Sequence, residues 1–289
     1  MNRQTNNNIL VPTDFSEVAD YAVKHAINVA KAYNNEITLI YIIEEGFFGN
    51  LFSKSQSAIM KDAIKTKLEV LADDIRNESK VTINTRIETG KVYKTIAEIA
   101  NEEKYDSIIM GSHGASGLEQ VVGSNASRTI QYAEVPVVVV KNISVGEQGY
   151  KKIVMPFDLT IESKQKLNWG ISVAKKFDSE IHIVFSQEED EYLKRKLNNN
   201  IARIKVALED NNVKFVMYEF KDGILDNFAN EVHNYAKIID ADLIVAMTHM
   251  EKGISEFIIG TMTQQLVNKA EKVAVMCIHP TEPNFNYDY

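Results

Sequence analysis

The chain has a single cysteine, Cys277, among its 289 residues, so no disulfide can form within it. It contains no run of the roughly 20 apolar residues that a membrane-spanning helix needs. Its first residues also lack the apolar segment of a secretory signal. We therefore expect a cytoplasmic location, no membrane partner and a reducing environment.

Basic residues are scarce relative to acidic ones. Lysine and arginine number 32 against 40 aspartates and glutamates, which gives a formal net charge of −8. A protein that binds a phosphate backbone needs a basic face, so nucleic acid is not an expected partner. An apolar fraction of 45% is ordinary for a soluble globular protein, and the length suits two domains of about 145 residues.

Short patterns recur 144 residues apart, since Pro12 and Asp14 match Pro156 and Asp158. Further matches are Glu36–Ile37 with Glu180–Ile181, Gly90 with Gly223, Ser112–His113 with Thr248–His249, Gly123–Ser124 with Gly260–Thr261, and 135–140 with 273–278. This repetition predicts one architecture used twice. We place the first domain at 1–143 and the second at 150–280, joined near 142–150, with a C-terminal tail at 281–289.

Strand-like and helix-like periods alternate within each unit. In the first unit we expect strands at 9–11, 37–43, 81–87, 107–110 and 135–140, and helices at 14–33, 64–75 and 95–103. Such alternation is typical of an α/β fold with a parallel sheet between helices. We therefore predict two tandem Rossmann-like domains, each with a five-stranded parallel sheet. Ligands in such sheets bind beyond the carboxyl ends of the strands.

A glycine-rich loop follows the strand at 107–110 and contains Gly111, Gly114 and Gly117. The pair Gly123–Ser124 then opens a segment with helical spacing. A strand, a glycine loop and a helix start let backbone N–H groups converge on an anion, with help from the helix dipole. The alternative interpretation is that these glycines serve only tight turns.

This stretch resembles the nucleotide-binding signature of the universal stress protein (UspA) family: glycine, two residues, glycine, nine residues, glycine, then serine or threonine. Here eight residues, 115–122, separate the second and third glycines. The resemblance covers residues 8–279 and implies adenine nucleotide alpha hydrolase-like domains that bind ATP or another adenine nucleotide, with Mg²⁺ accompanying it. By matching positions it implies Pro12, Thr13, Asp14, Ile42 and Met110 around the adenosine, and Gly111, Gly114, Gly123, Ser124 and Asn125 around the ribose and phosphates.

The last strand-like run of each unit is β-branched and would be prone to association if its edge stayed unpaired. Proteins resembling this one pair that strand with the same strand of a second copy. Here the second copy is covalently attached, so we expect 135–140 to pair with 273–278 in an intramolecular pseudo-dimer. Further pairing of two chains into a homodimer stays open.

The second unit departs from the glycine pattern, because Met247 and Met250 stand where Gly111 and Gly114 do. A long side chain at these positions would occupy the space in which backbone approaches a phosphate. We interpret the second unit as a scaffold without nucleotide; alternatively its methionines line an apolar pocket.

Two other features have ordinary structural explanations. Asp14, three residues before Glu17, has the spacing of a helix N-cap. His113 recurs as His249, but no nucleophile and orienting partner accompany either, so we expect loop histidines that bond local backbone. The histidines show no metal-ligand spacing.

Three functions compete. The first is a stress-responsive binding protein whose first unit holds an adenine nucleotide. The second is an interaction module without nucleotide, a pseudo-dimer scaffold whose pockets are empty or hold an apolar ligand. The third is a slow ATP hydrolase, for which the sequence has no Walker A motif and no nucleophile–base set. We expect no catalytic residues and favour the first function.

Overall fold

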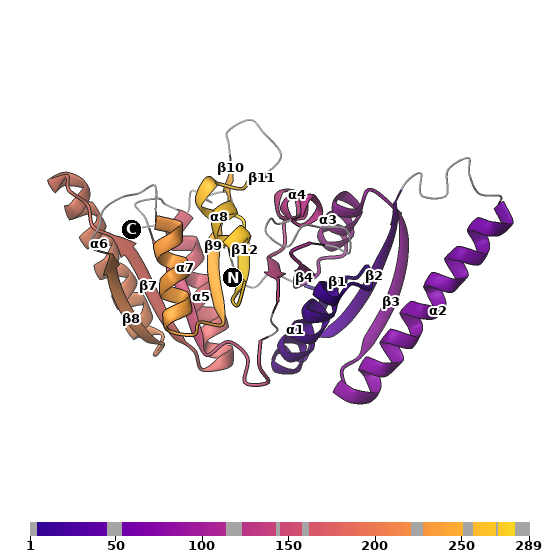
Figure 1. Ribbon diagram of the computed structural model, residues 1–289. Helices are drawn as coiled ribbons and strands as arrows, with labels where there is room; N and C mark the ends of the chain where they lie inside the picture. Colours follow the sequence, from indigo (N-terminus) through magenta and orange to yellow (C-terminus); the bar gives the residue numbers. More distant parts are fainter. Residues whose placement is uncertain are drawn as a thin grey trace.

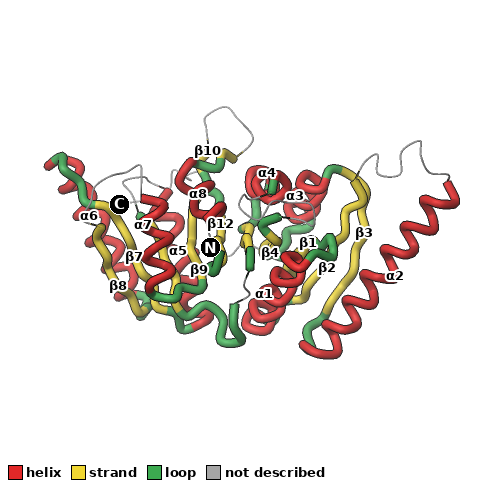
Figure 2. Tube along the Cα trace, in the orientation of Figure 1, coloured by secondary structure: helices red, strands yellow, loops and turns green. Residues whose placement is uncertain are grey.

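A computed structural model describes residues 5–44, 54–113, 123–142, 145–157, 162–220, 228–250, 257–269 and 271–280. Strands and helices alternate along these residues and form a layered α/β structure (Figures 1 and 2). The predicted tail at 281–289 and the loop residues 114–122 lie outside the described residues. No helix among the residues described is long and apolar enough to cross a membrane.

The first half contains β1 (Asn8–Pro12), α1 (Glu17–Tyr33), β2 (Glu36–Glu44), α2 (Lys54–Ser79), β3 (Ile83–Gly90), α3 (Val92–Glu102), β4 (Ser107–Gly111), α4 (Ser124–Tyr132) and β5 (Val137–Val140). The second contains β6 (Lys152–Pro156), α5 (Glu162–Phe177), β7 (Glu180–Ser186), α6 (Glu191–Asp210), β8 (Lys214–Phe220), α7 (Phe228–Ile238), β9 (Leu243–Met247), α8 (Thr261–Lys269) and β12 (Ala274–Ile278). A two-stranded hairpin of β10 (His249–Met250) and β11 (Phe257–Ile258) was not predicted.

Ten strands form one sheet in the order β3-β2-β1-β4-β5-β12-β9-β6-β7-β8. Neighbours within each half are parallel, and the two halves meet where β5 and β12 pair antiparallel, with Val138 opposite Met276. The predicted fold class, two tandem five-stranded units joined as an intramolecular pseudo-dimer, is therefore confirmed. The β-branched edge is covered by the second half, which removes an association-prone surface.

Helices cover both faces of the sheet, which explains why the strands read as continuous apolar runs. Helices α1, α2, α5 and α6 pack on one face, and α3, α4, α7 and α8 pack on the other (Figure 1). Cys277 lies within this core on β12, and burial raises the pKa of its thiol to about 12. The thiol is therefore protonated and shielded at neutral pH.

Helix α1 begins later than its sequence pattern suggests, and the predicted N-cap role of Asp14 is wrong. Ser16 is the N-cap, with its Oγ accepting from the Ala19 N–H at 3.3 Å. Asp14 Oδ1 instead accepts from the Ser16 N–H at 3.0 Å. The physical reason is Phe15, whose φ of +62° turns the chain left-handed and moves Asp14 out of the capping position.

Replacing this cap tests the assignment. Ser16→Ala removes the acceptor for the Ala19 N–H, and we expect it to lower the free energy of unfolding by about 1 kcal/mol. Asp14→Ala should cost less, because Asp14 bonds a turn outside the helix. Urea denaturation followed by circular dichroism measures both, and a larger loss for Asp14→Ala would contradict the assignment.

Residues 145–150, the described part of the segment joining the halves, pack against both of them. Tyr150 is 1% exposed, and its hydroxyl lies 2.6 Å from His25 Nε2 of α1. Val145 bonds the same helix twice, donating its N–H to His25 Nδ1 at 3.1 Å and accepting from Asn28 Nδ2 at 2.7 Å. The ring of Tyr150 also meets Phe177 of α5 edge-on, with centroids 5.0 Å apart. This seam ties the linker to a helix from each half.

Candidate functional site

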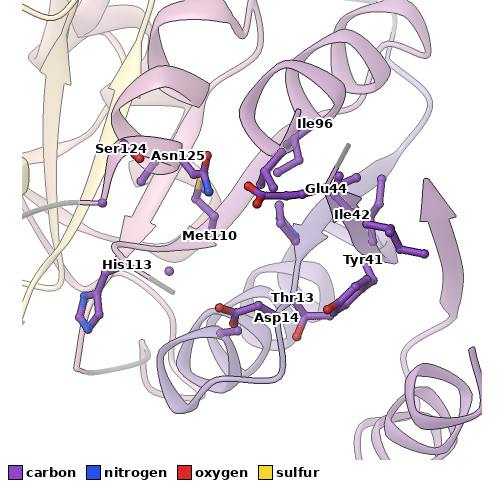
Figure 3. Close-up of a pocket in the computed structure, with 18 of the residues that line it drawn as sticks. Thr13, Asp14, Tyr41, Ile42, Glu44, Ile96, Met110, His113, Ser124 and Asn125 are labelled. Atoms are coloured by element: carbon purple, nitrogen blue, oxygen red, sulfur yellow. The ribbon is translucent and has the colours of Figure 1, made fainter. Parts of the chain in front are cut away.

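A cavity of about 520 Å³ opens at the carboxyl edge of the first half's strands (Figure 3). Its walls come from the ends of β1, β2 and β4 and from helices α1, α2, α3 and α4. Strands β1 and β4 are neighbours in the sheet but not in sequence, so their connections leave toward opposite faces. This is the switch point at which doubly wound sheets bind ligands.

The residues implied for an adenosine all line this cavity. Thr13 is fixed because its N–H donates to the Ile40 carbonyl at 2.9 Å. Ile42 and Met110 bring apolar side chains from β2 and β4. The full set implied for the adenosine, all of it in the lining, is Pro12, Thr13, Asp14, Ile42 and Met110.

The residues implied for ribose and phosphate contribute mainly backbone. Gly111, Gly123, Ser124 and Asn125 line the cavity, while Gly114 lies outside the described residues. The Gly123 N–H donates to the Ser112 carbonyl at 2.7 Å, and α4 starts at the next residue. The first N–H groups of a helix have no partner within it and carry partial positive charge. The start of α4 is therefore suited to an anion.

At two positions of the site, Gly111 and Gly123, neighbouring atoms leave little room for a side chain. A Cβ on Gly111 would lie 2.9 Å from Val18 Cγ1 and 3.2 Å from the Val18 carbonyl oxygen. A Cβ on Gly123 would lie 3.3 Å from both His113 Cα and the Ser112 carbonyl oxygen. A side chain at Gly111 would require Val18 of α1 to shift, and one at Gly123 would press on the backbone that follows β4.

Several lining residues were not predicted: Tyr41, Glu44, Ile64, Val92, Ile96 and His113. Tyr41 and Glu44 flank the predicted Ile42 on the same strand end, which is a usable signal. Ile64 lies on α2, and the spacing of residues in the sequence does not show where that helix packs on the sheet. Burial and the nearby Asp14 carboxylate raise the pKa of the Tyr41 hydroxyl.

Among the described residues the contact of the His113 ring is with a side chain. Its Nδ1 lies 2.9 Å from Ser112 Oγ, so its partner is the neighbouring side chain. The carboxylates of the lining are Asp14 and Glu44, and no lysine or arginine occurs among the lining residues within the described ranges. Those ranges also contain no group of three or more histidine, cysteine, aspartate or glutamate residues placed to hold a metal.

The matching edge of the second half carries bulkier side chains. Phe157 replaces Thr13 and is 3% exposed, and Lys166 replaces Ala22 and is 2% exposed. The Lys166 ammonium donates to the Pro156 carbonyl and lies 4.8 Å from the centre of the Phe157 ring. Thr263 donates its hydroxyl to the Met247 carbonyl at 2.8 Å. These contacts fit the interpretation of the second half as a scaffold.

Comparison with known proteins gives consistent results. Residues 5–141 match the sequence model of the Universal stress protein family. Two universal stress proteins of Methanocaldococcus jannaschii are 34% and 30% identical, over 81% and 93% of their lengths and 46% of this chain each. The crystal structure of a universal stress protein from Archaeoglobus fulgidus has a TM-score of 0.75 at 19% identity, covering 96% of this chain and 99% of that one. That last likeness concerns the fold.

Proposed function

The chain belongs to the universal stress protein family, and from this premise we propose that its first half binds an adenine nucleotide, ATP or a relative of it, in the cavity at β1, β2 and β4. The observation that carries the proposal is that residues from separate parts of the chain meet at one cavity. Residues from three strand ends and one helix start, which lie far apart in the sequence, border a single cavity. Its volume falls within the several hundred cubic ångströms usual for small-molecule sites.

The described walls suit the parts of such a ligand. Ile42 and Met110 offer apolar surface to a base, and Asp14 and Thr13 offer oxygen acceptors to hydroxyl or amino groups. The first turn of α4 would face the phosphates with backbone N–H groups. Asp14 and Glu44 repel anions, so Mg²⁺ bound with the nucleotide would offset part of that repulsion.

We further propose that the protein is a cytoplasmic, stress-responsive binding protein rather than an ATP hydrolase. The His113 ring contacts the Ser112 hydroxyl, but Ser112 is 1% exposed, so this pair does not present an accessible nucleophile. A nucleotide-free interaction module is the second candidate. It is favoured by the two carboxylates and by the lack of lysine or arginine among the described lining residues.

A charge at the start of α4 separates these candidates. Ser124→Glu places a carboxylate beside the proposed phosphates, and we expect it to weaken ATP binding about 100-fold, because closely placed like charges cost several kcal/mol. The same carboxylate should not destabilise the fold, since acidic residues suit helix N-termini. Native mass spectrometry with ATP and Mg²⁺, followed by calorimetric titration, gives the affinity.

The matched control is Thr261→Glu, the same change at the start of α8 in the second half. We expect it to leave one nucleotide bound per chain with unchanged affinity. Equal losses from both variants would contradict the assignment of the site to the first half. A wild-type protein that stays at its bare mass with ATP and Mg²⁺ would favour the interaction module.

A further inference from the structure

The turn that carries Thr13 and Asp14 into the cavity contains a strained residue. Phe15 has a φ of +62°, a left-handed conformation that costs a bulky L-residue free energy. This conformation allows two hydrogen bonds within the turn. The Phe15 N–H donates to Thr13 Oγ1 at 3.1 Å, and the Ser16 N–H donates to Asp14 Oδ1 at 3.0 Å. Each of the two cavity-lining side chains is therefore oriented by the residue two positions later.

Contacts outside the turn hold the Phe15 ring. It stacks on Tyr41 of β2, with centroids 5.2 Å apart and planes inclined by 26°. The ammonium of Lys67, from α2, lies 4.1 Å from the centre of the Phe15 ring. We call Lys67, Phe15 and Tyr41 the aromatic column. It joins α2, the β1–α1 turn and β2, and its end residue Tyr41 lines the cavity beside Thr13 and Asp14 (Figure 3).

We propose that the aromatic column is a positioning device that holds Thr13 and Asp14 ready for the ligand, with Phe15 as its central positioning residue. Without the stack, the turn's own hydrogen bonds are left to balance the left-handed strain, and the turn relaxes toward an ordinary negative φ. That relaxation breaks the hydrogen bonds that orient the Thr13 and Asp14 side chains, although the Thr13 N–H stays bonded to β2. A ligand must then restore the strained turn before it binds, which weakens its apparent affinity. This inference rests on the proposed function for its effect on nucleotide, but not for its effect on the turn.

The column also connects the ligand to α2. Lys67 is exposed on that helix, whereas Leu68 beside it is buried against the sheet. A cation over an aromatic face contributes modestly at an exposed site. Removing the Lys67 charge should therefore weaken the column without dismantling it. The cavity's affinity consequently depends on a residue that does not line it.

Hydrogen–deuterium exchange of the ligand-free protein tests the device directly. In Phe15→Ala the amides of Phe15 and Ser16 should exchange about tenfold faster, because left-handed strain of this size is no longer balanced. In Phe15→Tyr, which keeps the aromatic ring, exchange should match wild type. Phe15→Gly separates strain from stacking, since glycine adopts a positive φ without strain. Its exchange should lie between those of Phe15→Ala and wild type.

Binding of ATP with Mg²⁺ is then measured on the same folded variants. We expect Kd to rise about tenfold in Phe15→Ala, a few-fold in Lys67→Met and not measurably in Phe15→Tyr. A purely structural role of Phe15 would lower the denaturation midpoint while leaving both exchange at the turn and Kd unchanged, and that result would overturn the proposal. If wild type binds no nucleotide, the proposed function fails, and unchanged exchange in Phe15→Ala still decides against the column.

Discussion

Replacing Tyr150 by alanine is expected to lower the free energy of unfolding by about 3–5 kcal/mol, the range for a large aromatic removed from a core. Tyr150 is among the largest fully buried side chains and contacts both halves. Its loss leaves a hole beside Phe177 and removes the acceptor of the His25 Nε2–H. A buried donor without a partner adds its own penalty. Guanidinium denaturation followed by circular dichroism measures the change.

Two companion variants give the measurement its meaning. Tyr150→Phe keeps the packing and removes only the acceptor for His25, so it should cost about 1–2 kcal/mol. Tyr192→Ala removes a tyrosine that is 71% exposed on α6 and should change stability by less than about 0.5 kcal/mol. A Tyr150→Ala effect no larger than that of Tyr192→Ala would show that the seam does not stabilise the chain.

The seam is also where prediction from sequence reached its limit. Serine and glycines near 144–149 indicate a linker, but a linker composition does not show what the segment packs against. Gly149 has a φ of +68°, and a Cβ there would lie 2.0 Å from Phe177 Cδ1. The absence of a side chain at Gly149 therefore allows the linker to pack tightly against Phe177, which is distant in sequence. Such contacts depend on how the two halves assemble, which the local sequence does not encode.

The fold itself was predictable because its signals are local and repeated. Parallel strands buried on both faces must be apolar runs, and the internal repeat, at an offset of 144 residues for the first two strands, gives each run twice. The pairing of β5 with β12 was implied by the family resemblance, and it agrees with the need to cover β-branched edges. The start of α1 was misplaced because the pattern of Asp14 and Glu17 is compatible with a cap. Only the left-handed φ of Phe15 selects Ser16 instead.

The site was predictable to the extent that it lies at strand ends. The family resemblance implied the individual residues. Those of the glycine motif and those at the ends of β1 and β2 come together because parallel strands share one carboxyl edge. The contributions of Ile64 and Lys67 were not predictable, because α2 crosses over the sheet at a position that depends on tertiary packing. The proposed positioning role of Phe15 was not predictable either, because a phenylalanine in the sequence does not reveal a left-handed φ.

The second large effect concerns acid stability and originates at His25. Its ring is 1% exposed, and burial lowers its pKa from 6.5 to about 3. The hydrogen bonds require the neutral ring, because Nδ1 accepts from the Val145 N–H and Nε2 therefore carries the proton that faces Tyr150. Asp240, Asp242 and Lys272 border a cavity of about 180 Å³ beside it. A protonated ring would lose the Val145 bond within this seam.

Stability should consequently fall as the pH is lowered. The unfolded chain protonates His25 below pH 6.5, whereas the folded chain keeps it neutral down to about pH 3. The unfolded state therefore binds more protons in this window, so the stabilising contribution is full above pH 6.5 and declines below it. Between pH 7.5 and pH 5 the decline from this group amounts to about 2 kcal/mol.

His25→Asn isolates this contribution, because its amide offers an acceptor near the position of Nδ1 and does not titrate in this range. We expect the variant to be less stable than wild type at pH 7.5 and to lose about 2 kcal/mol less between pH 7.5 and pH 5. Burial also lowers the pKa of His182, but Glu180 opposes the shift, so His182→Asn should flatten the profile less. Denaturation curves at a series of pH values give the slopes. Parallel slopes for wild type and His25→Asn would mean that the buried ring does not control acid stability, and that the seam stays intact when its histidine is protonated.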